Sequence, residues 1–358
     1  MSVKSVLVTG FEPFGGHVAN VSGEVAKGLG LLDALHHPWS QEQFPVAVTV
    51  DVLSVDAEGA RRTAKRLKNG EQYDAVLHLG LCERCEVPQI EVLARDRLEM
   101  RIPDNLGRQV RNTTVDGGGD RGAWIDPSIW PKEVFNTPFH LSQDAGSFIC
   151  NETFFHTLKA MQQPSPTVLP TTCLFVHLPD ATRLDVEAST TFAEKVLAFL
   201  LHPTPEPPVH VVAGYLPGRK GRHLVAKRAP READAGCWEF PGGKIESGES
   251  WKEAIVRELR EELAIEVTAR HPLGTVVRTV GSTTFAVHLI MCEWSGEVDL
   301  QTLRVHEALT WVGADDSDRR WSGRDGEFHA LVNGLTHNQV DASPSSSIAR
   351  SSLMDRGT

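Results

Sequence analysis

A proline cluster at residues 202–208 constrains this chain more than any other feature. The segment His202-Pro-Thr-Pro-Glu-Pro-Pro208 has four prolines in seven positions, and neither a helix interior nor a central strand tolerates such a run. We therefore predict a linker at 203–208 between two domains, at 1–202 and 209–335. Two domains also agree with a length of 358 residues, because one domain takes roughly 150.

Both predicted domains alternate strand and helix patterns. Before the linker, apolar runs at 5–8, 74–78 and 173–176 predict buried strands, and helical spacing at 21–32 and 57–67 predicts helices. This alternation is typical of a parallel α/β layer. After the linker we expect a smaller α/β domain, with a helix at 251–263 and strands at 209–215, 223–227, 274–279, 284–293 and 309–312. We find no internal repeat, and we expect the polar tail at 336–358 to be disordered.

Charge and composition exclude several function classes. With 36 basic and 47 acidic residues, the net charge of -11 disfavours a nucleic acid or an anionic membrane as partner. No apolar run approaches the ~18 residues that span a bilayer, and the N-terminal run is too short for a signal peptide. Six cysteines in so long a chain do not form a disulfide scaffold, so we expect mostly reduced thiols and a cytoplasmic protein. The sequence allows a homo-oligomer but does not specify one.

Three carboxylates share one face of the helix predicted at 251–263. Glu258, Glu261 and Glu262 stand at i, i+3 and i+4, so they repel one another unless a cation lies between them. Clustered carboxylates of this kind suit Mg²⁺ or Mn²⁺ together with substrate phosphates. Glu249 and Arg257 can orient these ligands. A solvated acidic helix face is the alternative for an isolated Glu-rich helix.

A glycine turn ahead of this helix favours a metal site over a solvated acidic helix face. The pattern begins at Gly243, continues after five residues with Glu249, and ends after seven more with Arg-Glu-Leu-Arg-Glu-Glu262. It resembles the motif of the Nudix hydrolases, except that Ala264 replaces the usual glycine. The resemblance implies a mixed sheet between helices and hydrolysis of a diphosphate linked to another moiety. It also implies that Glu258, Glu261 and Glu262 bind Mg²⁺ or Mn²⁺, that Glu261 is catalytic, and that Gly243, Glu249 and Arg257 support them. Glu307 resembles a further acidic ligand or base of MutT-like members.

The residues before the glycine turn bear on the substrate. Trp238-Glu-Phe-Pro-Gly-Gly-Lys244 is similar to the MutT branch, which implies hydrolysis of nucleoside triphosphates, including oxidised purine or cytidine nucleotides, with release of pyrophosphate. Lys227 and Arg228 close a predicted strand, where they either contact phosphates or are merely exposed. Asp325 either meets a base amino group or is an ordinary loop aspartate.

In the first domain, a thiol and an imidazole occupy positions where catalytic groups are found. Cys150 opens a predicted helix, where the helix dipole favours the thiolate, and His177 ends an apolar strand at the carboxyl edge of the predicted sheet. Taken alone, such a cysteine is as readily a buried core residue, and such a histidine is undistinguished.

Several motifs in order connect these two residues. These motifs are Thr9-Gly-Phe-Glu-Pro-Phe-Gly-Gly16, Arg101-Ile-Pro-Asp-Asn105, Cys150-Asn151 and Phe175-Val-His-Leu-Pro179. Through them the first domain resembles the pyroglutamyl peptidase I family over about residues 1 to 200. The resemblance implies an α/β/α fold without a cofactor and a catalytic triad in which Cys150 attacks an N-terminal pyroglutamyl carbonyl, His177 moves the proton and Glu91 orients His177. It further implies that Phe11, Phe14 and Asn20 line the pocket for the lactam ring.

The chain departs from that family near the expected site. Val92 and Asp96 replace an arginine and an asparagine that commonly follow the glutamate, Leu81 replaces a frequent glutamine, and Val21 replaces a proline. We therefore expect reduced activity or altered specificity. Cys82-Glu-Arg-Cys85 is a CxxC, but no second pair lies at zinc-ligand spacing, so we assign it no metal or redox role.

Our leading hypothesis is a fused bifunctional hydrolase, a cysteine exopeptidase ahead of a nucleotide pyrophosphohydrolase. Its partners are then small nucleotides and pyroglutamyl peptides, with no nucleic acid and no membrane. The alternative keeps the Nudix activity and treats the first domain as an inactive scaffold or binding module. A third reading, an RNA-processing Nudix protein, is disfavoured by the acidic charge balance.

Overall fold

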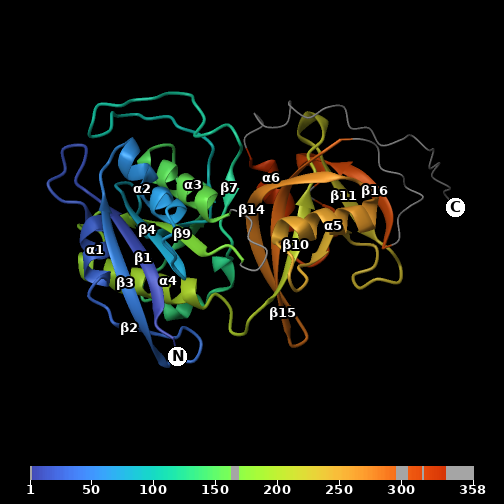
Figure 1. The fold of residues 1–358 in the computed structure, drawn as a ribbon, viewed down its shortest axis with the longest axis horizontal. Coiled ribbons are helices and arrows are strands. Elements are labelled where there is room, and N and C mark those ends of the chain that lie inside the picture. Colours follow the sequence, from blue (N-terminus) through green and yellow to red (C-terminus); the bar gives the residue numbers. More distant parts are fainter. Residues whose placement is uncertain (1, 163–168, 296–304, 317, 336–358) are drawn as a thin grey trace. The chain divides into compact units, whose positions relative to one another are not determined.

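The computed structural model describes residues 2–162, 169–295, 305–316 and 318–335 (Figure 1). It divides into two compact units, Met1–Pro208 with Pro272–Ala286, and Val209–His271 with Val287–Thr358. The proline segment 202–208 contains no helix or strand. Residues 272–286 group with the first unit although the sequence assigns them to the second domain. The predicted disordered tail, 336–358, lies outside the described residues.

The first unit is built on a seven-stranded sheet whose central four strands are parallel, as the alternating pattern predicts. Its order is β2 (Ala34–His36), β3 (Gln43–Leu53), β1 (Lys4–Phe11), β4 (Ala75–Cys82), β9 (Thr172–Pro179), β5 (Gln89–Glu91) and β8 (His140–Ser142). The short strands β2 and β5 run antiparallel to their longer neighbours, so the sheet is mixed rather than wholly parallel. A separate ribbon pairs β6 (Leu93–Ala94) with β7 (Arg121–Gly122).

Two pairs of helices cover this sheet and close the core (Figure 1). α1 (Val21–Leu29) packs with α4 (Val186–Leu201), and α2 (Ala57–Lys68) packs with α3 (Ile149–Met161). Short 3-10 turns lie at η1 (Pro127–Ile129) and η2 (Lys132–Val134). α1 ends three residues before its predicted end, because the chain turns at Gly30, whose amide caps the helix by bonding Ala26. The strands at the centre of the sheet are almost wholly buried, which explains their continuous apolar runs.

The chain after the proline segment forms two small sheets. One runs β13 (Gly242–Lys244), β10 (Val209–Tyr215), β15 (Thr283–Trp294) and β14 (Val267–Val280), and the other β12 (Trp238–Glu239), β11 (His223–Arg228) and β16 (His306–Val312). α5 (Trp251–Leu263) packs on β10 and β13, and α6 (Asp325–Asn333) follows η5 (Ala314–Asp316), with η3 (Arg219–Gly221) before β11. The predicted mixed α/β architecture is therefore confirmed in both units.

Among the helices in the described part of the chain, none is long and apolar enough to cross a membrane.

Helix α5 begins and ends where its sequence predicts. Ser250 and Glu253 form a reciprocal capping box at its N-terminus, and Ala264 ends it in the left-handed conformation, with φ 55° and ψ 33°. Glycine takes that conformation without the steric cost that alanine bears, which explains why Nudix motifs have glycine here. The departure at Ala264 thus alters only how the helix ends.

Replacing Ala264 should therefore stabilise the protein. We expect Ala264→Gly to raise the free energy of unfolding of the second unit by about 1 kcal/mol, because the left-handed strain is removed. Ala254→Gly, inside the same helix, is the matched control and should lower it by about 1 kcal/mol or more. Urea unfolding of the three proteins measures both effects; equal stability of Ala264→Gly and wild type would contradict this account.

Candidate functional site

The sheet of the first unit brings the predicted triad together from three elements. β9 carries His177 near its carboxyl end and pairs with β4 on one side and β5 on the other. In these ladders His177 lies opposite Gly80 of β4 and Gln89 of β5, and β5 ends at Glu91. Cys150 is the second residue of α3. Residues 27 to 86 positions apart in sequence thus meet at one sheet edge.

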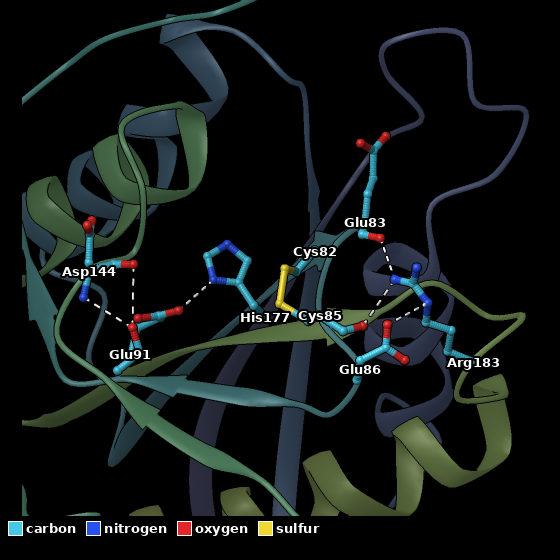
Figure 2. Close-up of a disulfide and its surroundings, with 9 residues drawn as sticks. Cys82, Glu83, Cys85, Glu86, Glu91, Asp144, His177 and Arg183 are labelled. Atoms are coloured by element: carbon cyan, nitrogen blue, oxygen red, sulfur yellow. Dashed lines mark hydrogen bonds and ion pairs between the residues drawn. A yellow bond between two sulfur atoms is a disulfide. The ribbon is translucent and has the colours of Figure 1, made fainter.

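A buried hydrogen bond holds the histidine. His177 Nδ1 lies 2.8 Å from Glu91 Oε1, and the Glu91 side chain is fully buried (Figure 2). Burial alone would lower the pKa of His177, but the hydrogen bonds to Cys150 and Glu91 and their charges outweigh it and raise that pKa well above its usual range. The imidazole is therefore a proton donor positioned between a thiol and a carboxylate.

The strand beside His177 leaves room for the thiol because it has glycine at the point of contact. A Cβ atom at Gly80 would lie 3.1 Å from Cys150 Sγ and 2.7 Å from the Phe175 ring. Any larger residue would push the thiol or that ring aside. Gly80 was not singled out from the sequence, since the strand pattern alone gives no signal of what lies across from it.

The three predicted pocket residues lie at the ends of β1 and α1. Phe11 is buried with its ring 6.3 Å from that of Phe175, and Phe14 is half-buried, 6.1 Å from the ring of Phe148. Asn20 caps α1, accepting bonds from Ser22, and its amide nitrogen donates to the Glu12 carbonyl at 3.0 Å. Its amide thus fixes the segment that carries the two aromatic rings.

The departures from the family pattern have distinct structural outcomes. Asp96 is buried and accepts hydrogen bonds from the backbone amides of residues 115, 116 and 119, so this carboxylate anchors a loop. Leu81 packs against the core, and Val21 is buried in the first turn of α1. Val92 follows Glu91, whose second oxygen, Oε2, is buried with no hydrogen-bond partner among the described residues.

One expectation about the cysteines needs correction. Cys82 and Cys85 form a disulfide, whereas Cys150, Cys173, Cys237 and Cys292 are free. The expectation of mostly reduced thiols therefore holds for four of the six, and the correction concerns the CxxC pair, to which we assigned no redox role. The spacing of Cys82 and Cys85 permits a bond because the chain turns directly after β4, with the Cys85 amide bonded to the Cys82 carbonyl at 3.2 Å.

In the second unit, Arg257 organises the acidic face of α5. Its guanidinium binds both oxygens of Glu249, at 3.1 and 2.7 Å, and Glu258 Oε1 at 2.9 Å. It also lies 3.5 Å from Glu261, whose side chain is 62% exposed. Hydrogen bonding to Arg257 lowers the pKa of Glu249. Arg257 thus contacts two of the three carboxylates that it was predicted to support, Glu258 and Glu261, and Glu249 is linked to them through Arg257.

Gly243 permits the close packing of this turn against α5. A Cβ atom there would lie 2.3 Å from the Glu258 carboxylate, so no other residue fits without displacing it. The turn and the helix therefore approach closely at the first carboxylate of the motif.

Glu262 is the most perturbed carboxylate of the group. Burial, followed by the charges of Glu239 and Glu258, raises its pKa to about 8. The Gly242 amide donates to its Oε2 at 3.0 Å. Burial also raises the pKa of Glu258. Glu239, which was not predicted as a site residue although it lies in the segment 238–244, binds Arg228 and His306 in the structure.

These carboxylates fit a divalent cation chemically. Oxygen ligands that repel one another in a partly buried position gain most from a bound Mg²⁺ or Mn²⁺. Among the residues that the structure describes, no three His, Cys, Asp or Glu side chains already lie in a metal-binding arrangement. Arg257 compensates part of the charge of Glu258 and Glu261.

The remaining predicted residues of the second unit lie in ion pairs or in the core. Lys227 Nζ pairs with Glu307 Oε1 at 2.6 Å, and Arg228 pairs with Glu239. The neighbouring charges that raise the Glu262 pKa are those of Glu239 and Glu258, and Glu307 is not among them. Asp325 is buried in the first turn of α6, rather than in a loop, and accepts from the Phe240 amide at 2.8 Å.

The two arrangements define the class of this chain. A cysteine–histidine–glutamate cluster in one unit and an acidic helix beside a glycine turn in the other are features of hydrolases. The family model described as pyroglutamyl peptidase matches residues 4–191, and that described as the NUDIX domain matches residues 207–332. The chain therefore belongs to the pyroglutamyl peptidase family and, through its second part, to the Nudix hydrolases.

Relatives match each part separately. The CTP pyrophosphohydrolase of Escherichia coli (strain K12) is 38% identical over 111 residues, covering 30% of this chain and 78% of that protein. The 8-oxo-dGTP diphosphatase of Proteus vulgaris is 33% identical over 91 residues, covering 25% and 81%. The pyrrolidone-carboxylate peptidase of Brevibacillus brevis is 28% identical over 181 residues, covering 49% and 79%.

The raised pKa of Glu262 predicts how the metal-free second unit responds to pH. Its pKa of about 8 in the folded unit lies above the ordinary glutamate pKa of 4.5, so the folded unit holds this proton more tightly than the unfolded chain. The free energy of unfolding should then fall by a few kcal/mol as the pH rises from about 4.5 through about 8. Hydrogen exchange of the α5 amides in EDTA measures this slope.

Two variants test whether Glu262 causes this pH dependence. Glu262→Gln keeps the shape without the charge and should flatten the slope. Glu261→Gln removes a neighbouring exposed carboxylate and should leave it nearly unchanged. A wild-type slope that persists in Glu262→Gln would assign the pH dependence to another group.

Proposed function

We propose that this protein is a fused bifunctional hydrolase. The first unit removes N-terminal pyroglutamate from peptides with a cysteine nucleophile, and the second hydrolyses nucleoside triphosphates to release pyrophosphate. The observation that carries the peptidase proposal is the buried Glu91–His177 hydrogen bond beside Cys150. We propose a cytoplasmic location, which the four free cysteines favour and the Cys82–Cys85 disulfide does not.

In the peptidase step, the Cys150 thiolate attacks the carbonyl carbon of the pyroglutamyl residue. The carbon–nitrogen bond then breaks, His177 donates its proton to the leaving amine, and a thioester remains on Cys150. His177 next takes a proton from water, which attacks the thioester and releases pyroglutamate. Glu91 stabilises the imidazolium and fixes its orientation throughout. Phe11 and Phe14 supply apolar walls for the lactam ring.

The second unit would catalyse the nucleotide reaction with a different set of groups. Glu258, Glu261 and Glu262 would hold Mg²⁺ or Mn²⁺, and Arg257 with Glu249 would keep those carboxylates oriented. The bound cation supplies positive charge to the diphosphate and polarises phosphorus. Glu261, the most exposed of the three ligands, is our candidate for the catalytic carboxylate. Lys227 and Arg228 reach phosphate only by leaving their ion pairs with Glu307 and Glu239.

Relatives narrow the nucleotide substrate. Two of them are named for CTP and for 8-oxo-dGTP, so we propose a pyrimidine or oxidised purine nucleoside triphosphate. An RNA substrate remains disfavoured by the net charge of -11.

A second candidate function keeps only the nucleotide activity. Val92 in place of an arginine, and the buried, unpartnered Oε2 of Glu91, favour a first unit that binds pyroglutamyl groups without turnover. The two candidates differ in one measurable quantity, the release of an amine from a pyroglutamyl amide.

Two variants should separate the activities. Cys150→Ala should lower the turnover of a fluorogenic pyroglutamyl amide by at least about a thousandfold, because the nucleophile is lost, while pyrophosphate release from CTP stays unchanged. Glu261→Gln should lower pyrophosphate release by about a hundredfold and spare the peptidase. Both assays use reducing buffer with Mg²⁺, and the peptidase assay is repeated in EDTA. Loss of both activities in either variant would refute two independent sites.

A further inference from the structure

The disulfide between Cys82 and Cys85 has no part in either proposed reaction. It closes the turn that begins where β4 ends, and the exposed residues Glu83 and Arg84 lie between the two cysteines. Two cysteines at this spacing can exchange electrons as a pair, because opening the bond leaves both sulfurs within reach of each other.

The sheet order places this turn against the catalytic strand. β9 lies between β4 and β5, so the chain must pass the carboxyl end of β9 to travel from one neighbour to the other. Cys82, the last residue of β4, lies opposite Pro179, and β5 begins at Gln89, opposite His177. The connection 83–88 therefore spans the end of the strand that carries His177. It leads directly to Glu91, and in the view of Figure 2 the His177 ring lies between the disulfide and Glu91.

Apart from the disulfide, the side-chain hydrogen bonds and ion pairs that hold residues 83–88 in the described structure involve exposed or partly exposed groups. Arg183 donates to the carbonyls of Glu83 and Cys85, at 2.5 and 3.3 Å, and lies 3.4 Å from the Glu86 carboxylate (Figure 2). His17 bonds Glu83, whose side chain is 59% exposed. Solvent-exposed ion pairs of this kind contribute little stability. The covalent bond is therefore the strongest constraint on the turn.

The same connection touches the predicted lactam pocket. The His17 ring, held by Glu83 at 2.6 Å, lies 5.9 Å from the Phe14 ring. A movement of the turn thus reaches the triad through β5 and the pocket through His17.

We propose that Cys82 and Cys85 form a reversible redox modification site that sets the rate of the peptidase. In the disulfide form the bond closes residues 82–85 into a tight turn, and this turn keeps Glu91 aligned with His177. In the dithiol form the connection relaxes, so the alignment of Glu91 and His177 is lost in part of the population. This inference rests on the proposed peptidase function of the first unit.

The exchange reaction needs an external dithiol. A thiolate of that reagent attacks the sulfur of Cys82, which is half-buried, whereas Cys85 is only 6% exposed. The Cys82–Cys85 bond breaks, Cys85 leaves as a thiolate that takes up a proton, and a mixed disulfide forms on Cys82. The second thiol of the reagent then displaces Cys82, so the protein gains two electrons and two protons and the reagent becomes a disulfide.

The test is a redox titration of the full chain with mixtures of reduced and oxidised dithiothreitol. At each ratio, alkylation followed by peptide mass mapping reports the state of Cys82 and Cys85, and a fluorogenic pyroglutamyl amide reports kcat and KM. We expect kcat to fall about tenfold as the pair is reduced, a loss within the range known for small misplacements of catalytic groups. KM should change less than kcat.

Matched variants isolate the pair. The double variant Cys82→Ser, Cys85→Ser should show the low kcat at every ratio, and Cys237→Ser, which alters a free cysteine of the second unit, should respond like wild type. A double variant that responds to the ratio as wild type does would overturn the proposal.

A measurement that needs no substrate tests the redox site independently of the proposed peptidase activity. Hydrogen exchange of peptides covering 82–91 should speed up several-fold on reduction in wild type, while a peptide from α4 should stay unchanged. Unchanged exchange at 82–91 in protein whose pair is fully reduced would overturn the redox site even with a working peptidase. Faster exchange together with a complete absence of turnover would instead overturn the peptidase function.

Discussion

The pairing of β9 with a strand on each side is the constraint on which the peptidase site depends. One ladder sets Gly80 opposite His177, which leaves space for the Cys150 thiol, and the other brings Glu91 to the buried side of the imidazole. A buried carboxylate is costly unless it is compensated, and here the raised pKa of His177 shows that compensation. The same two ladders place the Cys82–Cys85 turn at the end of β9, so a change at the turn acts on the catalytic strand.

In the second unit, the charges of the acidic residues are compensated in a different way. Its acidic residues lie on one helix and are compensated from that helix and its turn by Arg257, while Glu262 stays buried with a raised pKa. In the proposed nucleotide reaction these carboxylates would also hold a cation against a phosphate, whereas the proposed peptidase reaction uses groups of the protein alone. Each unit contains its own set of chemical groups, and this separation is the physical basis for proposing two independent activities on one chain.

The sequence predicted what local patterns determine. α5 begins and ends as predicted, because its apolar spacing, capping box and terminal residue all agree. β5 and β8 were missed, because three residues carry no period and their pairing is set by distant strands. Glu239 and Gly80 were missed for a similar reason, since each matters through a residue far along the chain. The CxxC spacing did not determine whether the two thiols are bonded, because a redox pair and a coincidence share that spacing.

The central claim is that Cys150 is the nucleophile of a working peptidase, and trapping the covalent intermediate tests it most directly. Metal-free protein, with Cys150 as a free thiol and the Cys82–Cys85 disulfide intact, is mixed with excess pyroglutamyl amide, quenched in acid within milliseconds to seconds, and mapped by peptide mass. The account predicts a pyroglutamyl thioester on the peptide that contains Cys150, absent from Cys150→Ala. An unmodified Cys150 peptide together with unconsumed substrate would contradict it and leave the first unit as a binding module.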